Sequence, residues 1–318
     1  MIENGEDWLD EWSISIRPRR TPETVRRYVV HVRAFFTWMS ERYPEVREAE
    51  GVSKSHVRSW LAYLADEGKT TKSGRAPMSP GTVRLRGICL ILFYRYVYTE
   101  CELPTDRNPT LDIELPYIDP EKTPVKPISD DSLAALLKSM SGRSFLDLRD
   151  TAIVRLFIDT GMRRIELCRL DLDHVDHRAK EVRVHGKGDK FRVLPFSDNT
   201  SLALRRYLRV RETHGLAKVS RVFFLSYAAR TEHGRLSPNS MNEMLEKRAR
   251  NAGIVHIHPH AIRHSWALDL EEAGLSGPQL EVLGGWSSRS VMVRRYTNHN
   301  RDKRAVDNAR KLARGDRF

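Results

Sequence analysis

Two cationic residues in the second half of the chain have neighbours that could make them functional. Arg163 lies two residues after a glycine that ends a predicted helix, and Glu166 shares its face if a helix restarts there. Lys187 lies between two glycines in the turn of a predicted hairpin. Guanidinium and ammonium groups suit the binding of an anion such as phosphate. Taken singly, however, an ion pair and a turn lysine are the ordinary explanations.

Three further candidates follow in the C-terminal third. His260 and Arg263 are three residues apart and would share a helix face. Tyr296 follows in the basic string Val-Arg-Arg-Tyr. Histidine can move protons near neutral pH, and a tyrosine hydroxyl can act as a nucleophile. A capping histidine and a partly buried tyrosine are the structural alternatives.

The histidines around position 260 also allow a zinc site to be considered. Four of them lie close together in the sequence, namely His256, His258, His260 and His264. His260 and His264 are one helical turn apart, which suits two ligands of one metal ion. No HExxH glutamate and no cysteine accompanies them, so we give zinc little weight and predict no metal site.

The net charge of +12 is distributed unevenly along the chain. Residues 1–16 carry five acidic residues and no Lys or Arg, whereas residues 17–100 carry 16 basic against 8 acidic residues. Residues 101–140 are acidic again, with 4 basic against 8 acidic residues, and residues 141–318 carry 34 against 21. Two basic bodies joined by an acidic connector are typical of a protein that holds a polyanion from two sides.

The N-terminal part reads as a small helical bundle. Helices are expected to begin at Thr21, Ser53 and Ser79, each a capping residue, and a shorter helix should hold Trp8 and Trp12. One loop and the following helix, from residue 68 to 99, carry six basic residues and no acid. We expect them to contact DNA phosphates: Lys69, Lys72, Arg75, Arg84, Arg86 and Arg95.

Prolines divide the chain into two domains. Six prolines fall between positions 104 and 127 and stiffen the connector. We predict a helical domain over 1–118, a proline-rich linker over 119–128 and a second domain with a C-terminal tail helix over 129–318. The length of 318 residues agrees with two domains.

The second domain is predicted to be mainly α with a small antiparallel β-sheet. Helices are expected from Ser129, over 146–160, and around 198–213, 237–252, 260–273 and 277–284, with another from 290 to the end. The strings 181–185 and 190–194 alternate and predict a hairpin. We expect Val182 and Val184 on one face of the first strand, and Phe191 and Val193 on one face of the second.

Composition excludes several classes of protein. Three cysteines without a CxxC spacing cannot form an even disulfide framework, which suits a reducing compartment. The N-terminus is acidic where a signal peptide would be basic, and no apolar run approaches the roughly 18 residues of a membrane span. We therefore expect a cytoplasmic protein without membrane contact.

In their order along the chain, the local strings resemble the tyrosine recombinase (phage integrase) family. TGMRRIEL is similar to its TGxRxxEL box, HGKGDKFRVLP to its hairpin GKGxKxRxxP, and HPHAIRHSWA to its PHxLRHxxAT helix. LGGWSSRS, which contains Trp286, is similar to the box that precedes the nucleophilic tyrosine. The resemblance implies a SAM-like helical core-binding domain followed by an α+β catalytic domain, in a two-domain form without an arm-binding domain.

The resemblance implies a role for each matched residue. Tyr296 would be the nucleophile that forms a 3′-phosphotyrosyl link with DNA. Arg163 and Arg263 would bind the non-bridging phosphate oxygens, for which planar guanidinium donors are suited. Lys187 would be the general acid to the leaving 5′-oxygen. His260 would orient the phosphate and accept the tyrosine proton, because an unperturbed phenol has a pKa of about 10.

The resemblance also implies roles for two further residues and no need for a cofactor. Trp286 occupies the position of a His or Trp that can donate to a phosphate oxygen, and Glu166 that of an acidic residue that holds the first arginine. The bond energy is kept in the phosphotyrosine, so neither ATP nor a metal is implied. Trp286 and Tyr296 are ten residues apart, one more than is usual in the family. Delivery of Tyr296 in cis or in trans therefore stays open.

The implied function is site-specific recombination of double-stranded DNA at core sites through a Holliday junction. The implied assembly is a dimer on each site and a tetramer in the synapse, with an accessory directionality factor as a further partner. The amphipathic tail after residue 300 would dock on a neighbouring protomer or on its own domain. The alternatives are a topoisomerase IB-like or telomere-resolvase enzyme with the same chemistry, or a catalytically idle DNA-binding regulator.

Overall fold

The computed structural model divides the chain into two compact units, Met1–Asp119 and Pro120–Phe318. We call them unit 1 and unit 2 and describe each by itself. The structure describes residues 4–71, 74–119, 127–186, 191–227, 234–254, 257–288, 290, 293, 294, 296, 306 and 310. Most of the predicted linker and most of the predicted tail helix lie outside these residues. Among the described residues, no helix has both the length and the apolar character needed to cross a bilayer.

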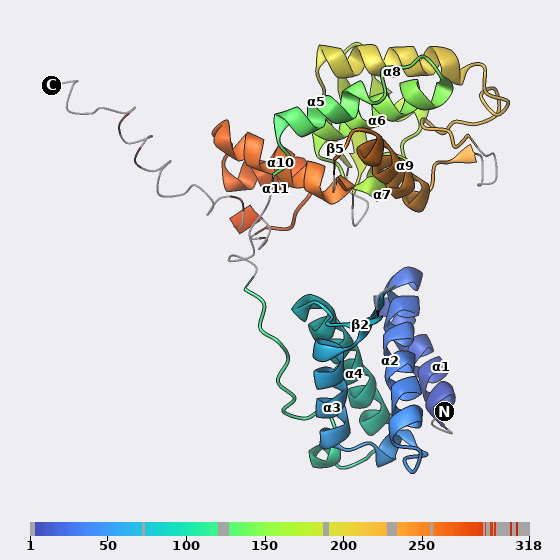
Figure 1. The fold of residues 1–318 in the computed structure, drawn as a ribbon, viewed down its shortest axis with the longest axis vertical. Coiled ribbons are helices and arrows are strands. Elements are labelled where there is room, and N and C mark those ends of the chain that lie inside the picture. Colours follow the sequence, from blue (N-terminus) through green and yellow to red (C-terminus); the bar gives the residue numbers. More distant parts are fainter. Residues whose placement is uncertain are drawn as a thin grey trace. The chain divides into compact units, whose positions relative to one another are not determined.

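Unit 1 is a bundle of α-helices with one short hairpin (Figure 1). Its helices are α1 (Gly5–Ile16), α2 (Pro22–Arg42), α3 (Lys54–Asp66) and α4 (Pro80–Glu100), with short 3₁₀ turns at Arg17–Arg19, Ala49–Gly51 and Thr105–Arg107. The predicted starts are confirmed, because the side chains of Thr21, Ser53 and Ser79 each accept a hydrogen bond from the backbone N–H three residues on.

Aromatic side chains from these helices fill the core of unit 1. Trp12, Phe36 and Phe93, from α1, α2 and α4, are almost fully buried and meet edge to face. The segment after α3, predicted as a loop, instead forms the antiparallel strands β1 (Lys69–Thr71) and β2 (Gly74–Ala76). Each strand has only three residues and no buried side chain, so the sequence shows no apolar alternation there.

Unit 2 is built around the buried helix α6. The helices are α5 (Asp130–Lys138), α6 (Phe145–Thr160), α7 (Arg164–Cys168), α8 (Asp198–Arg211), α9 (Pro238–Asn251), α10 (Pro259–Glu272) and α11 (Gly277–Gly284), with a 3₁₀ turn at Leu172–His174. Helix α6 packs against α8, α10 and the last strand of the sheet. Figure 1 shows α10 and α11 side by side in orange, and the two helices are in contact.

The sheet of unit 2 has the antiparallel order β3 (Val175–Asp176), β4 (Glu181–His185) and β5 (Phe191–Pro195). The alternation predicted for β4 is confirmed, since Val182 and Val184 are fully buried. Phe191 and Val193 share a face of β5 as predicted, but this face is the outer one, because both residues are about half exposed. Register sets the inward face, since Arg192 lies opposite Val184 and Leu194 opposite Val182.

Candidate active site

Arg163 and Glu166 form the first part of the site at the start of α7. Arg163 is the residue before the first turn of α7, so the restart of a helix after Gly161 brings the two side chains together. The Nη1 of Arg163 donates to Oε1 of Glu166 at 2.9 Å, and the backbone N–H of Arg163 donates to Oε2 at 2.7 Å. The Arg163 side chain keeps 40% exposure, whereas that of Glu166 keeps 7%. Arg163 can therefore bind an anion that arrives from solvent. The buried carboxylate of Glu166 meanwhile holds the Arg163 side chain in place.

Arg192, on β5, approaches the same carboxylate. Its Nη1 and Nη2 donate to Oε1 and Oε2 of Glu166 at 3.0 and 2.7 Å, and its Nε donates to the carbonyl of Leu283 at 2.8 Å. Burial by itself would raise the pKa of Glu166, but the hydrogen bonds and charges of Arg192 and then Arg163 outweigh it and lower the pKa. Glu166 is therefore ionised at neutral pH.

Arg263 lies on α10 and is 2% exposed. Its Nη1 donates to the carbonyl of Gly161 at 2.6 Å, and its Nη2 donates to that of Gly284 at 2.5 Å. Burial first, and then the positive charge of Arg163, lower the pKa of Arg263 to about 9. The guanidinium consequently remains charged at neutral pH, and its charge is held near that of Arg163.

The end of α11 gathers these arginines. The carbonyls of the consecutive residues 283–285 accept hydrogen bonds from Arg192, Arg263 and Arg163, respectively. The last carbonyls of a helix lack partners within it and carry partial negative charge. The helix end therefore satisfies its own acceptors with guanidinium donors and offsets part of the repulsion between three close cations.

Glycine is required where α11 ends. Gly285 has the left-handed φ of +60°, and a Cβ there would lie 2.9 Å from Nη1 of Arg192 and 3.3 Å from Nη1 of Arg163. A Cβ on Gly284 would collide with the indole of Trp286. The two glycines of the Leu-Gly-Gly-Trp string thus let the backbone reach the arginine side chains.

Tyr296 is fully buried against the same group of residues. Its ring centroid lies 5.6 Å from that of Trp286 and 5.6 Å from that of His264. The Arg263 guanidinium lies over the Trp286 ring, with its Cζ 4.2 Å from the centroid. The fold therefore brings Arg163, Arg263, Trp286 and Tyr296 together from separate parts of the sequence.

Two further predicted site residues, His260 and Lys187, are not part of this buried group as the structure describes it. His260 is exposed, and its ring lies 4.3 Å from that of His264, which in turn contacts Tyr296. Lys187 lies outside the described residues, as do His256 and most of the hairpin turn. Neither His264 nor Arg192 was expected from the sequence to take part in catalysis, although both belong to the matched strings, His264 in PHAIRHSWA and Arg192 in GKGDKFRVLP.

The part of the chain that the structure describes contains no group of three or more His, Cys, Asp or Glu side chains placed to hold a metal ion. The rings of His260 and His264 are in edge-to-face contact, with their centroids 4.3 Å apart. The side chains gathered at the end of α11 are cationic, so they suit the binding of an anion.

In unit 1, the described members of the predicted phosphate-contacting set differ in exposure. Lys69 is exposed on β1, and Arg75 on β2 donates to the hydroxyl of Tyr63 at 2.8 Å. Arg84 is half-buried and donates to the carbonyl of Pro116 at 3.1 Å. Arg86 is also half-buried, and its Cζ lies 6.0 Å from the ring centroid of Trp60. Lys72 lies outside the described residues.

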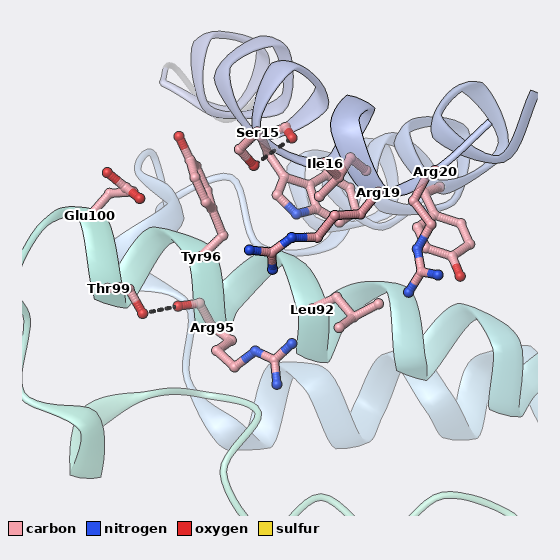
Figure 2. Close-up of a pocket in the computed structure, with 11 residues that line it drawn as sticks. Ser15, Ile16, Arg19, Arg20, Leu92, Arg95, Tyr96, Thr99 and Glu100 are labelled. Atoms are coloured by element: carbon pink, nitrogen blue, oxygen red, sulfur yellow. Dashed lines mark hydrogen bonds between the residues drawn. The ribbon is translucent and has the colours of Figure 1, made fainter. Parts of the chain in front are cut away.

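Arg95, the last member of the set, lines a cleft of about 500 Å³ between the end of α1 and α4. Figure 2 shows Arg19 and Arg20 on the α1 side of this cleft and Arg95 on the α4 side. Trp12 and Tyr28 also line the cleft, so its cations stand beside aromatic rings. Basic side chains are therefore present on both β1–β2 and the far half of α4.

Gly161 supports the site because its carbonyl accepts a hydrogen bond from Arg263. Its structural role can be tested through the free energy of unfolding. The residue ends α6 with a φ of +52°, and a Cβ there would collide with Trp266. We expect Gly161→Ala to lower the free energy of unfolding by about 2–4 kcal/mol, from left-handed strain plus overpacking. Gly253→Ala, with a φ of +70° and no atom within 4 Å of its Cβ, should cost only about 1 kcal/mol.

Urea denaturation of both variants checks this prediction. Gly215→Ala is the matched control, because its Cβ would also meet no atom within 4 Å and its φ is not left-handed. Equal losses for Gly161→Ala and Gly253→Ala would show that contact with Trp266 contributes nothing.

Comparison with known families covers both units. The model of the phage integrase family matches residues 126–303, and the model of the phage integrase N-terminal SAM-like domain matches residues 9–80. The first match contains every residue of the site in unit 2. The second covers α2, α3 and the β1–β2 hairpin of unit 1.

Similar proteins are named as recombinases. The tyrosine recombinase XerC of Alcanivorax borkumensis is 35% identical over 231 residues, which are 72% of this chain and 70% of that protein. XerC of Myxococcus xanthus is 31% identical over 286 residues, or 87% of each chain. Among solved structures, the XerH recombinase bound to its difH substrate has a TM-score of 0.66 at 18% identity, covering 96% of this chain and 83% of that one.

A lambda integrase tetramer bound to a Holliday junction has a TM-score of 0.64 at 16% identity, covering 90% of this chain and 78% of that one. At such identities the two solved structures show a shared fold. The catalytic-domain family model covers more than half of the sequence, and the relative from Myxococcus xanthus exceeds 30% identity over most of it. The chain belongs to the phage integrase family, the tyrosine recombinases.

Proposed function

We propose that this chain is a site-specific DNA recombinase that cleaves and rejoins duplex DNA through a 3′-phosphotyrosyl link at Tyr296. The observation that carries the proposal is the convergence of Arg163, Arg263 and Trp286 with Tyr296 at the end of α11. Two guanidiniums beside one phenol supply a nucleophile and the charge that a pentavalent phosphate transition state needs.

The chemistry is one transesterification and its reverse. The Tyr296 oxygen attacks the scissile phosphorus, the bond to the 5′-oxygen breaks, and Lys187 donates a proton to that oxygen. Arg163 and Arg263 bind the non-bridging oxygens, and Glu166 keeps Arg163 in place. His260 assists the loss of the tyrosine proton. A free 5′-hydroxyl from the partner strand then reverses the reaction and joins the exchanged strands without ATP or metal.

A conformational step must precede cleavage. The Tyr296 side chain is fully buried, so its hydroxyl cannot meet a phosphate until the packing around it changes. The ring contacts with Trp286 and His264 would be the ones to rearrange. We expect DNA binding to supply the free energy for this change. Whether Tyr296 reaches the phosphate in cis or in trans depends on the segment between Trp286 and Tyr296.

The partner is double-stranded DNA with specific core sites. The net charge of +12 supports binding to a polyanion, and the basic residues of unit 1 are proposed to contact its phosphates. XerH is described in complex with difH, and lambda integrase as a dimer on a core site and a tetramer on a Holliday junction. We therefore propose a dimer per site and a tetramer in the synapse, acting on DNA of the nucleoid in the cytoplasm.

Capture of the covalent intermediate tests the proposal. A library of duplexes of varied sequence, each with a nick at a fixed position, traps the enzyme wherever cleavage falls close to the nick, because the short cleaved fragment diffuses away. Sequencing of DNA that remains attached after denaturation should return one family of related sites. Attachment to all sequences with relaxation of supercoils would instead indicate a topoisomerase, and binding without attachment would indicate an inactive regulator.

Replacement of Lys187 tests the proton donor. We expect Lys187→Ala to slow cleavage of a normal site by about 10²- to 10⁴-fold, the usual contribution of general acid catalysis. A substrate with a sulfur in place of the leaving 5′-oxygen should restore the rate, because a thiol is acidic enough to leave without a proton. Single-turnover rates of wild type and variant on both substrates decide this, and equal defects on both would remove Lys187 from the role.

A further inference from the structure

Arg192 occupies an unusual position for a long cationic residue. It lies in β5 directly opposite the fully buried Val184, so its side chain is on the inner face of the sheet. The side chain is only 9% exposed. Burying a cation destabilises the fold unless the cation is paired and hydrogen-bonded. The partners of Arg192 therefore indicate its role.

The partners of Arg192 both belong to the site. Two parallel N–H donors bind the two oxygens of Glu166, and Nε binds the carbonyl of Leu283. Glu166 in turn binds the backbone and the guanidinium of Arg163. Arg163 completes a ring of contacts by donating to the carbonyl of Gly285. Arg192 therefore fixes the acid and the helix end that together hold Arg163.

The two arginines on Glu166 have different duties. Arg163 is 40% exposed and Arg192 is 9% exposed, although both bind the same carboxylate. All three guanidinium nitrogens of Arg192 already donate to protein groups, whereas Arg163 is the more exposed of the two cations on Glu166 and the one that an incoming phosphate meets more readily.

We propose that Arg192 is a positioning residue that sets the orientation of Arg163 toward the scissile phosphate. It acts through Glu166 and through the end of α11, and the inference rests on the proposed function. Without the Arg192 fork, Glu166 keeps one cationic partner, and Arg163 loses the fixed orientation of the carboxylate that holds it. A lysine cannot replace the fork, because a single ammonium cannot bind both oxygens in parallel and also reach Leu283.

The position of Arg192 in the sequence gives it a second connection. β5 starts at Phe191, immediately after the segment 187–190 that carries Lys187. Arg192 therefore anchors the strand that leads out of that segment to the Glu166 pair. One residue thus links the chain that carries the proposed acid with the arginine that binds the phosphate.

The experiment compares two substrates that differ in charge. One duplex has the normal scissile phosphodiester, and the other has a methylphosphonate, in which a methyl group replaces a non-bridging oxygen and removes the negative charge. Both use the site sequence recovered by covalent capture. Arg192→Met, which keeps a long buried side chain, should form covalent complex about 10- to 100-fold more slowly than wild type on the phosphodiester.

On the methylphosphonate the ratio of variant to wild-type rate should return to within about threefold of one, because orientation of Arg163 matters little without a charge to neutralise. A purely structural defect would lower the two rates by the same factor. Equal defects on both substrates, or no defect on the phosphodiester, would overturn the proposal. The double variant Arg192→Met with Arg163→Ala should be no slower than Arg163→Ala alone.

Controls separate this inference from folding and from the proposed function. Arg248→Met removes another largely buried arginine of unit 2, which pairs with Asp147 and Asp150, and should lose stability but keep the wild-type rate ratio on both substrates. Arg192→Lys, which keeps the charge, is the second variant if Arg192→Met does not fold, with the same expected pattern. If wild type forms no covalent complex with either duplex, the proposed function itself fails.

Discussion

Tyr296→Phe will form no covalent complex with a nicked core-site duplex, while wild type will. The substitution removes only the hydroxyl oxygen that would bond to phosphorus, so no alternative nucleophile is introduced. The ring packs between Trp286 and His264, and phenylalanine keeps these contacts. Denaturing gels of radiolabelled duplex measure the result, with the detection limit placing the loss at more than about 10⁴-fold.

Binding and folding should survive this substitution. We expect the dissociation constant of Tyr296→Phe for the site to stay within about threefold of wild type, because the cationic side chains that bind phosphates are unchanged and phenylalanine keeps the ring contacts. Tyr227→Phe is the matched control, since Tyr227 is a tyrosine of unit 2 that is 68% exposed. A covalent product from Tyr296→Phe would show that another residue is the nucleophile.

Arg263→Lys will reduce the single-turnover rate of covalent complex formation by about 10²- to 10³-fold, the usual cost of removing a preorganised donor from a charged transition state. Lysine keeps the charge but not the planar fork that can bind a phosphate while holding two carbonyls. Those carbonyls belong to Gly161 and Gly284, so the same side chain joins the end of α6 to the end of α11.

Stability must be measured beside the rate for Arg263→Lys. A buried carbonyl left without a donor costs about 1–3 kcal/mol, and lysine can satisfy only part of this need. Arg221→Lys is the control, because Arg221 forms a surface ion pair with Asp173 and should change neither quantity measurably. A folded Arg263→Lys protein with the wild-type cleavage rate would contradict the assigned role.

Local sequence predicted the elements well where a periodic apolar pattern and a cap agreed. Thr21, Ser53 and Ser79 start helices because a side-chain oxygen at that position satisfies a free N–H of the first turn. Gly161 ends α6 because it adopts the left-handed conformation without strain. The β1–β2 hairpin was missed because its three-residue strands bury nothing and so leave no alternation to detect.

β5 illustrates a limit of the apolar pattern. Phe191 and Val193 share an apolar face as expected, yet that face is exposed, and Arg192 and Leu194 point inward. Register with β4 places Arg192 opposite a buried valine, and Glu166 from a distant part of the chain makes that burial tolerable. Alternation alone cannot reveal a charge whose partner is supplied by tertiary contact.

The types and order of the site residues, the helix ends and the uneven charge can all be predicted from the sequence, because they depend on residue type and short spacing. Arg163, His260, Arg263, Trp286 and Tyr296 could all be named from their strings. Which atoms these residues touch depends on the folding of distant segments against one another. This folding set Arg163 and Arg263 on adjacent carbonyls at the end of α11, placed Arg192 behind Glu166, and buried Tyr296. Such contacts join residues up to 122 positions apart, so they follow from the packing of helices and strands and not from any local pattern.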